Sequence, residues 1–303
     1  MTAAIRTPQQ TDRRALAQAC RTAGFPGAEM AEPLRLAENE TWRLPDHQVV
    51  VRIVAPGQAL AAGREVRVAR WLAANDVPTL HPLDIPQPVD IDGGRAATFW
   101  QQLPDHRHGT ITDVATALRA LHSLPAPEFL PPLDPFVRVA DRLAAATTLN
   151  EDDRRWLSGL SADLAAAWRE RPPGAPDAPV HGDAWPGNIV RTTTGHVLMI
   201  DLERFSVGPP EWDLVSTAVR FTTTGAVTAS QYATFCTAYG GQAADVTQWS
   251  GYATLAGIRE LRMITYAAQH AARHPKWADQ AQHRIDCLRG RRGPRPWHWT
   301  GIL

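Results

Sequence analysis

The stretch from His181 to Val190 reads HGDAWPGNIV, and it decides how the whole chain is interpreted. Proline and glycine at 186 and 187 prevent it from continuing as a helix. Asp183 and Asn188 stand five positions apart in it. A further oxygen donor, Asp201, ends the segment HVLMID, which we expect to be a short buried strand. The sequence therefore places two acids and an amide around a loop and a strand.

This set of side chains suits phosphoryl transfer, in which catalysis consists of positioning reactants and neutralising charge. One carboxylate can orient a hydroxyl and accept its proton, while hard oxygen donors can hold Mg²⁺. The protein-kinase signature places an asparagine five residues after its catalytic aspartate, with a metal-binding aspartate beyond a hairpin. An isolated HGD turn or strand-end acid is common, but the joint spacing, with PEWDLV at 210–215 downstream, favours a kinase-like protein.

HGDAWPGNIV followed by MIDLERFSVGPPEWDLV (199–215) resembles the aminoglycoside phosphotransferase and choline kinase-like family. The resemblance implies ATP and Mg²⁺ as cofactors and a hydroxyl of a small molecule as the phosphoryl acceptor. The roles it implies are carried by the following residues: Asp183 as catalytic base, Asn188 and Asp201 as metal ligands, Glu203 as a further metal or water contact, His181 and Asp213 as structural support, and Trp185 near the acceptor.

The order of predicted elements indicates an α+β, bilobal protein-kinase-like fold. A small β-rich N-lobe, residues 1–103, would bind the nucleotide, and a larger, mainly helical C-lobe, residues 104–303, would carry the catalytic loop and acceptor site. Hydrophobic periodicity supports this order. We expect strands within 33–44, 47–54 and 95–104, and helices at 11–23, 58–74, 112–123, 135–148, 151–170 and 250–272.

The N-lobe lacks a GxGxxG loop, so the expected phosphate loop is LAENETWRL (36–44), with Asn39, Glu40 and Thr41 at its tip. Arg52 in VVVRIV stands where kinases place a lysine, and a guanidinium can also pair with phosphate oxygens. Glu65 is its expected helix partner, although a surface arginine and a solvated glutamate are the simpler alternative.

Backbone groups from Gln101 to Leu103, after the last strand of the N-lobe, would hold the adenine. Side chains in this segment carry little information about the nucleotide.

The composition of the chain limits the classes of partner that it is expected to bind. The net charge is zero, so no global field attracts nucleic acid or a membrane surface, and no apolar run reaches the about 18 residues of a membrane span. The N-terminus has no apolar stretch typical of a secretory signal, and three dispersed cysteines predict reduced thiols, so cytoplasm is the expected location.

Two groups of histidines invite a zinc hypothesis: His106 and His108 with His122, and His270 with His274 at helical spacing. Neither has the remaining ligands of a known motif, so we interpret both as ordinary histidines. The basic run at 289–295 is expected to be a solvated tail.

The acceptor stays open between an aminoglycoside or other antibiotic and a sugar or amino-alcohol metabolite. A polycationic aminoglycoside would need an acidic cleft. The acids that could supply it are Glu203, Glu211, Glu260, Asp279 and Asp286. The alternative function is a pseudokinase-like module that binds nucleotide without turnover.

Overall fold

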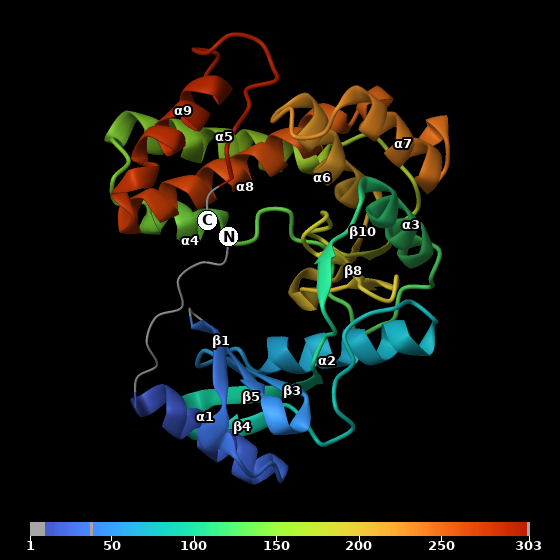
Figure 1. Cartoon of the computed structure of the whole chain (residues 1–303). Helices are drawn as coiled ribbons and strands as arrows, with labels where there is room; N and C mark the ends of the chain where they lie inside the picture. Colours follow the sequence, from blue (N-terminus) through green and yellow to red (C-terminus); the bar gives the residue numbers. More distant parts are fainter. Residues whose placement is uncertain (1–9, 37–38, 302–303) are drawn as a thin grey trace. The chain divides into compact units, whose positions relative to one another are not determined.

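The N-terminal part of the chain builds a five-stranded antiparallel sheet in the computed structural model, which describes residues 10–36 and 39–301. The strand order is β1-β2-β3-β5-β4 (Figure 1). The strands are β1 (Glu32–Leu36), β2 (Glu40–Leu44), β3 (Val49–Val54), β4 (Val89–Ile91) and β5 (Arg95–Gln101).

Alternation along β3 determines which helix each residue meets, because successive side chains of a strand point to opposite faces. Val49, Val51 and Ile53 join the core that packs against α1 (Gln10–Ala23). Val54 lies in a separate small core with Ala62 of α2 (Ala59–Ala74). The face that carries position 52 is therefore the face covered by α2.

The segment 33–44, predicted as one strand, is a hairpin of β1 and β2. Its residues 37 and 38, part of the expected phosphate loop, lie outside the described residues. Asn39 precedes β2, and its side-chain oxygen accepts a hydrogen bond from the Ala55 N–H at 3.3 Å. Glu40 and Thr41 were predicted to lie at the tip of this loop, but they belong to β2.

Glu40 departs from the expected position because it alternates in phase with the buried Trp42 and Leu44. Its carboxylate is buried and lies 2.6 Å from the Arg95 guanidinium. This ion pair with Arg95 of β5 holds the Glu40 side chain against the sheet.

A second, three-stranded antiparallel sheet has the order β6-β8-β9. It consists of β6 (His106–His108), β8 (Ile189–Thr192) and β9 (Val197–Met199). Met199 bridges to Thr79, whose hydroxyl donates to its carbonyl at 2.9 Å, so this hairpin groups with the N-terminal sheet.

The chain divides into two units. The first runs to Gly109 and includes Gly187–Arg204; the second contains Thr110–Pro186 and the chain from Phe205 on. These bounds differ from the predicted lobes because the β8–β9 hairpin groups with the first unit. The second unit also holds a small ribbon of β7 (Ala178–Val180) and β10 (Ser206–Gly208).

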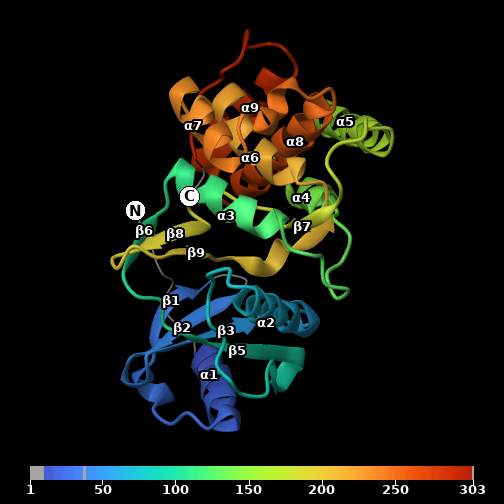
Figure 2. The same cartoon turned by 90° about the vertical axis from the view of Figure 1, so that its right-hand side faces the viewer.

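Helices dominate the second unit (Figure 2). They are α3 (Ile111–His122), α4 (Val139–Ala145), α5 (Glu151–Arg169), α6 (Glu211–Thr222), α7 (Ala229–Tyr239), α8 (Tyr252–Arg273) and α9 (Ala278–Leu288). α8 contacts α4, α5, α6 and α9, and its buried Leu261 and Ile264 belong to a core that it shares with α4, α5 and α9. α4 is shorter than the predicted helix 135–148 because Arg138 at its start has a left-handed φ of 62°.

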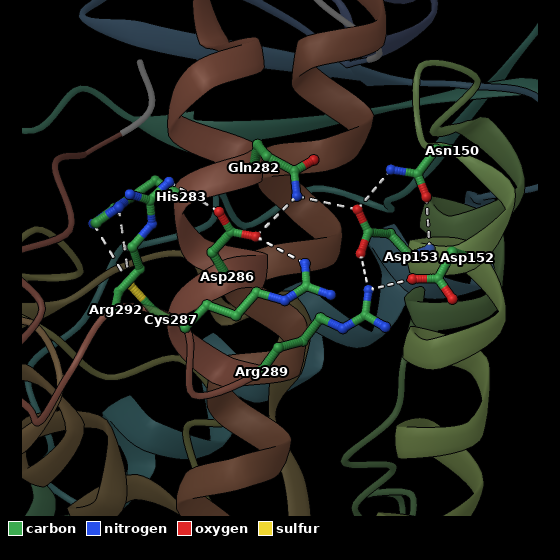
Figure 3. A network of polar contacts seen from close by, with 10 residues as sticks. Asn150, Asp152, Asp153, Gln282, His283, Asp286, Cys287, Arg289 and Arg292 are labelled. Carbon is green, nitrogen blue, oxygen red and sulfur yellow. Dashed lines mark hydrogen bonds and ion pairs between the residues drawn. The ribbon is translucent and has the colours of Figure 1, made fainter.

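The arginines of the basic run at 289–295 form ion pairs with acids of the second unit. Figure 3 shows Arg289 between Asp152 and Asp153 at the start of α5, and Arg292 on Asp286. Gln282 joins the two groups by donating to Asp153 and to Asp286. Residues 290–295 are exposed, as expected, but the sequence did not indicate these acidic partners, most of which are brought beside the run by the packing of α5 and α9.

The end of the chain continues this pattern. Arg295 forms a bidentate ion pair with the buried carboxylate of Glu260 in α8, with contacts of 2.8 to 3.0 Å. The N–H of Trp297 donates to the Thr223 carbonyl at 2.7 Å. The C-terminal segment is therefore packed on α6 and α8.

Within the described ranges, no helix combines the length and the apolar character needed to cross a membrane. The three cysteines are buried and form no disulfide in this part of the chain.

Candidate active site

The HGD turn is held in shape by the first turn of α6. The Asp213 carboxylate accepts hydrogen bonds from the backbone N–H groups of His181 at 2.7 Å and Gly182 at 2.9 Å. Gly182 has a φ of 80°, which side chains with a Cβ rarely adopt. The indole N–H of Trp212 also donates to the Gly182 carbonyl, at 3.3 Å. The PEWD segment therefore binds the turn through both its tryptophan and its acid.

Asp213 is fully buried but remains an anion. Burial opposes ionisation, yet the hydrogen bond from His122 at 3.1 Å and the nearby basic side chains outweigh it and hold the pKa of Asp213 below its ordinary value. His122 is itself held by the Tyr239 hydroxyl at 2.8 Å. A charged carboxylate is thus available to the backbone of the turn.

Asp183 follows the turn, and 49% of its side-chain surface is exposed. Its backbone N–H donates to His181 at 3.3 Å. Arg259 of α8 places its guanidinium 3.7 Å from one carboxylate oxygen of Asp183. His181 therefore holds the backbone of Asp183 and Arg259 contacts its side chain, while about half of that side chain stays exposed.

Arg259 is a buried cation with a well-defined position. It stacks on the Trp212 ring at 4.1 Å and donates to the Trp212 carbonyl at 3.0 Å. Burial lowers its pKa from the ordinary value, and the charges of Asp183 and Asp213 act in the opposite direction. Because α6 holds the arginine from two sides, its approach to Asp183 is fixed by the fold.

Trp185, two residues beyond Asp183, is half-buried. Its ring lies 5.6 Å from the guanidinium of Arg220 in α6. The catalytic candidate and this aromatic ring therefore belong to the same short loop.

The other predicted residues lie in the first unit, because the unit boundary falls between Pro186 and Gly187. Asn188 and Asp201 occupy the same end of the β8–β9 hairpin, where the Ile200 N–H donates to the Asn188 carbonyl at 2.9 Å. Asn188 is buried, whereas Asp201 is exposed and has a left-handed φ of 60°. A non-glycine residue in that conformation is uncommon and often marks a functional site.

The structure brings Arg52 and Glu65 together, with the guanidinium 2.5 Å from the carboxylate. Glu203, in the short 3₁₀ turn Leu202–Arg204, lies 3.7 Å from Arg52 and 3.2 Å from Arg204. Glu203 is thus already engaged by two cations.

Burial raises the pKa of Glu65 to about 7. Arg52 acts against this rise, while the charges of Glu203 and Asp201 add to it. The pH at which Glu65 ionises is therefore unusual for a glutamate.

The connector at the end of β5, residues 101–103, has one backbone N–H without a hydrogen bond among the described residues. Gln101 donates to the His81 carbonyl at 2.8 Å, and Gln102 to the Gln48 carbonyl at 2.7 Å. The Leu103 N–H makes no hydrogen bond with any part of the chain that the structure describes. A pocket of about 320 Å³ adjoins this connector, lined among others by Thr79, Thr192 and Leu198.

The histidines form no metal centre. Among residues 10–36 and 39–301, no group of three or more His, Cys, Asp or Glu side chains is placed to hold a metal ion. His106 and His108 are exposed on β6. His270 stacks on His274 at 6.1 Å, and its pKa is lowered by burial and by nearby positive groups. Asn188 and Asp201 do not form a group of this kind, because Asn188 would supply an amide oxygen in place of a carboxylate.

The sequence did not identify Arg220 or Arg259 as site residues. Both lie in ordinary helical segments with no local motif, and only the packing of α6 and α8 brings them to the HGD loop. Trp212 carried a weak signal, since it directly precedes the acid of PEWD.

A small antiparallel sheet, a helical region and an acid-bearing loop braced by the next helix define the protein-kinase-like class of phosphotransferases. The predicted α+β fold is confirmed. The match to a family model over residues 31–258 goes further: the chain belongs to the phosphotransferase enzyme family, and it is an enzyme of the small-molecule kinase class.

Solved structures with this fold include aminoglycoside phosphotransferase APH(3'')-Id from Streptomyces rimosus, with a TM-score of 0.61 and 23% identity over 82% of this chain and 98% of that one. A choline/ethanolamine kinase family protein from Mesorhizobium loti has a TM-score of 0.58 and 20% identity, covering 92% and 93%. Amicoumacin kinase hAmiN, in complex with AMP-PNP, Ca²⁺ and Ami, has a TM-score of 0.65 and 12% identity, covering 91% and 95%. A search of curated proteins found no match to this chain.

Proposed function

We propose that this protein transfers the γ-phosphoryl group of ATP, in the presence of Mg²⁺, to a hydroxyl of a small molecule. The observation that carries the proposal is the HGD turn, in which the buried Asp213 fixes the backbone while Asp183 stays half exposed. The nucleotide complexes described for neighbours of the same fold, with ADP and with AMP-PNP, support the choice of nucleotide.

Asp183 is the proposed catalytic base. A carboxylate in this position orients the attacking hydroxyl and receives its proton as the bond to phosphorus forms. Arg259 acts through Asp183: its guanidinium lies 3.7 Å from one carboxylate oxygen and helps to fix the orientation of the side chain. We therefore assign Arg259 as a positioning residue.

Asn188 and Asp201 are the proposed metal ligands, and their chemistry fits Mg²⁺, which prefers hard oxygen donors and takes few of them from protein. Bound Mg²⁺ would neutralise negative charge on the phosphates during transfer. Glu203 is the weaker candidate, because Arg52 and Arg204 already engage its carboxylate. It fits better as a water contact or as a brace for Arg52.

Arg52 is the proposed phosphate-binding cation of the first unit, held by Glu65 at 2.5 Å. A guanidinium that is fixed by an acid can still present its remaining N–H groups to phosphate oxygens. At the connector, the Leu103 N–H is the proposed donor to the adenine, with the Gln101 carbonyl beside it. The use of ATP and the cysteines without disulfides support a cytoplasmic location.

The test is a screen for ADP formation with Mg-ATP and a broad panel of hydroxyl compounds, followed by product mass. A product heavier by one phosphoryl group is the expected result, and Asp183→Asn should abolish it. Asp163→Asn, an exposed acid on α5, is the matched control. Nucleotide binding without acceptor-dependent ADP for any compound would contradict the proposal and favour the pseudokinase alternative.

A further inference from the structure

Arg220 is a cation that has no acidic partner among the described residues. It lies in the last turn of α6. Its Nε is buried and has no hydrogen-bond partner in the described part of the chain. Burial is the cause that lowers its pKa from the ordinary value, with no acid acting in the opposite direction.

Leaving a partly buried guanidinium without a counter-charge is costly, because desolvation is not offset by an ion pair. Other arginines of the second unit have acceptors for their N–H groups. Arg289 binds two aspartates, and Arg295 binds Glu260. Arg284, which is buried without an acid, donates to the carbonyls of Met263 and Thr300. The Arg220 side chain differs because it has no hydrogen-bond acceptor among the described residues, and such unpaired groups occur where a ligand completes the pairing.

The position of Arg220 connects it to the acceptor. Its guanidinium lies 5.6 Å from the centre of the Trp185 ring, and Trp185 follows the proposed base by two residues. Arg259 approaches Asp183 to 3.7 Å. The loop that presents the base is thus contacted by two cations of the same unit.

The acids that a polycationic acceptor would need are mostly bound already. Glu260 is buried and accepts Arg295 and the Thr223 hydroxyl. Asp286 accepts Arg291 and Arg292.

Glu203 lies against Arg52 and Arg204. Glu211 accepts the Ala175 N–H at 2.7 Å, and its other oxygen is buried without a hydrogen-bond partner among the described residues. Asp279 is exposed on the first turn of α9. Arginines therefore neutralise Glu203, Glu260 and Asp286, whereas Arg220 beside Trp185 pairs with no acid in the described part of the chain, and this balance favours an anionic acceptor over a cationic one.

We infer that the acceptor carries an oxyanion, a carboxylate or a phosphate, in addition to its hydroxyl, and that Arg220 binds this group beside the Trp185 ring. A guanidinium matches both oxyanions through paired N–H donors. The inference rests on the proposed function and names the substrate class for the same site. It makes Arg220 a specificity-determining residue and places aminoglycosides outside the preferred acceptors.

The experiment compares matched acceptors under Mg-ATP. The pairs are 3-(hydroxymethyl)benzoate with its primary amide, 4-hydroxybutyrate with its amide, and glycerol 3-phosphate with glycerol, and kanamycin serves as the polycation. At least one anionic member should exceed its uncharged counterpart by at least about tenfold in kcat/KM, which corresponds to about 1.4 kcal/mol. The benzoate and glycerol phosphate pairs separate the two kinds of oxyanion.

Arg220→Gln should remove this preference mainly by raising KM for the anionic acceptor, with the KM for ATP unchanged. Arg220→Lys, which keeps the charge, should retain part of it. Arg155→Gln is the control, because Arg155 is an exposed arginine of α5 in the same unit. Melting temperatures of all variants show whether each is folded.

Turnover of kanamycin or of the uncharged members in preference to the anions would overturn the inference and leave the phosphotransferase function standing. The same holds if Arg220→Gln keeps the wild-type preference. Absence of ADP formation with every acceptor would instead contradict the proposed function itself, and the inference would fall with it.

Discussion

The Asp213 carboxylate accepts a hydrogen bond from the backbone N–H of His181 at 2.7 Å, across 32 positions of sequence. Together with the bond from Gly182, it ties the shape of the HGD turn to the start of α6. The loop that carries the proposed base is thus built by tertiary contacts, and its integrity can be tested apart from its chemistry.

Replacing Asp213 by asparagine should destabilise the fold and lower the activity together. An amide presents one acceptor oxygen where the carboxylate serves two backbone donors and His122, so a buried donor is left without a partner. We expect a loss of about 2 to 4 kcal/mol, measured as a lower melting temperature. Asp163→Asn on α5 is the control. An unchanged melting temperature would contradict the role of Asp213 as the brace of the turn.

Replacing Asp183 by asparagine should have the opposite profile. Half of this side chain is exposed, so stability should change little. If Asp183 is the base, kcat should fall by about 10² to 10⁴-fold, while the affinity for ATP, measured by titration calorimetry, stays the same. A variant with kcat within threefold of wild type would show that another group accepts the proton.

The two acids of the IDxE segment should respond differently to Mg²⁺. Asp201→Asn removes an exposed carboxylate at the end of the hairpin and should raise the Mg²⁺ concentration for half-maximal activity by at least about tenfold. Glu203→Gln should raise it much less, because Arg52 and Arg204 already hold that carboxylate. Equal shifts for the two variants would indicate that both acids ligate the metal directly.

Glu65 gives the stability a distinct pH dependence. Its pKa is raised from 4.5 to about 7, so between these values the folded state binds more protons than the unfolded state. Its stabilising contribution is therefore complete below pH 4.5 and is lost as the pH rises to about 7. The melting temperature of wild type minus that of Glu65→Gln should decrease over this range.

Glu151→Gln, at an exposed position of α5, is the matched control for removing a carboxylate. A difference for Glu65→Gln that stays flat over this range would mean that Arg52 compensates the buried carboxylate more fully than its burial indicates.

Local patterns were sufficient for much of the fold. Amphipathic periodicity located α2, α5 and α8 to within two residues at either end, and the β-branched run of β3 predicted its strand. The hairpin at 33–44 was missed because the pattern did not reveal its turn. The short strands β6, β7 and β10 carry too few residues for a periodic signal, and tertiary pairing alone makes them strands.

Some residues of the candidate site could likewise be predicted from local patterns, and others could not. Asp183, Asn188 and Asp201 could be identified because their spacing is fixed by one loop and one hairpin. Arg52 could be matched to Glu65 because VVVRIV stands where kinases place a lysine, whose partner is a glutamate of the following helix. Arg220 and Arg259 could not, since their relation to the loop depends on how α6 and α8 cross. The catalytic and metal roles of all these residues stay predictions until they are tested.

The pairing of Glu260 with Arg295 has a consequence for synthesis of the protein. The glutamate is buried in α8, and its partner is encoded 35 residues later, so the helix is synthesised before its counter-charge exists. The first unit's sheet needs no such late residue for its core. We expect chains that stop before Arg295 to expose the apolar centre of the helical unit and to be captured by chaperones, because Glu260 would be buried there without its counter-charge.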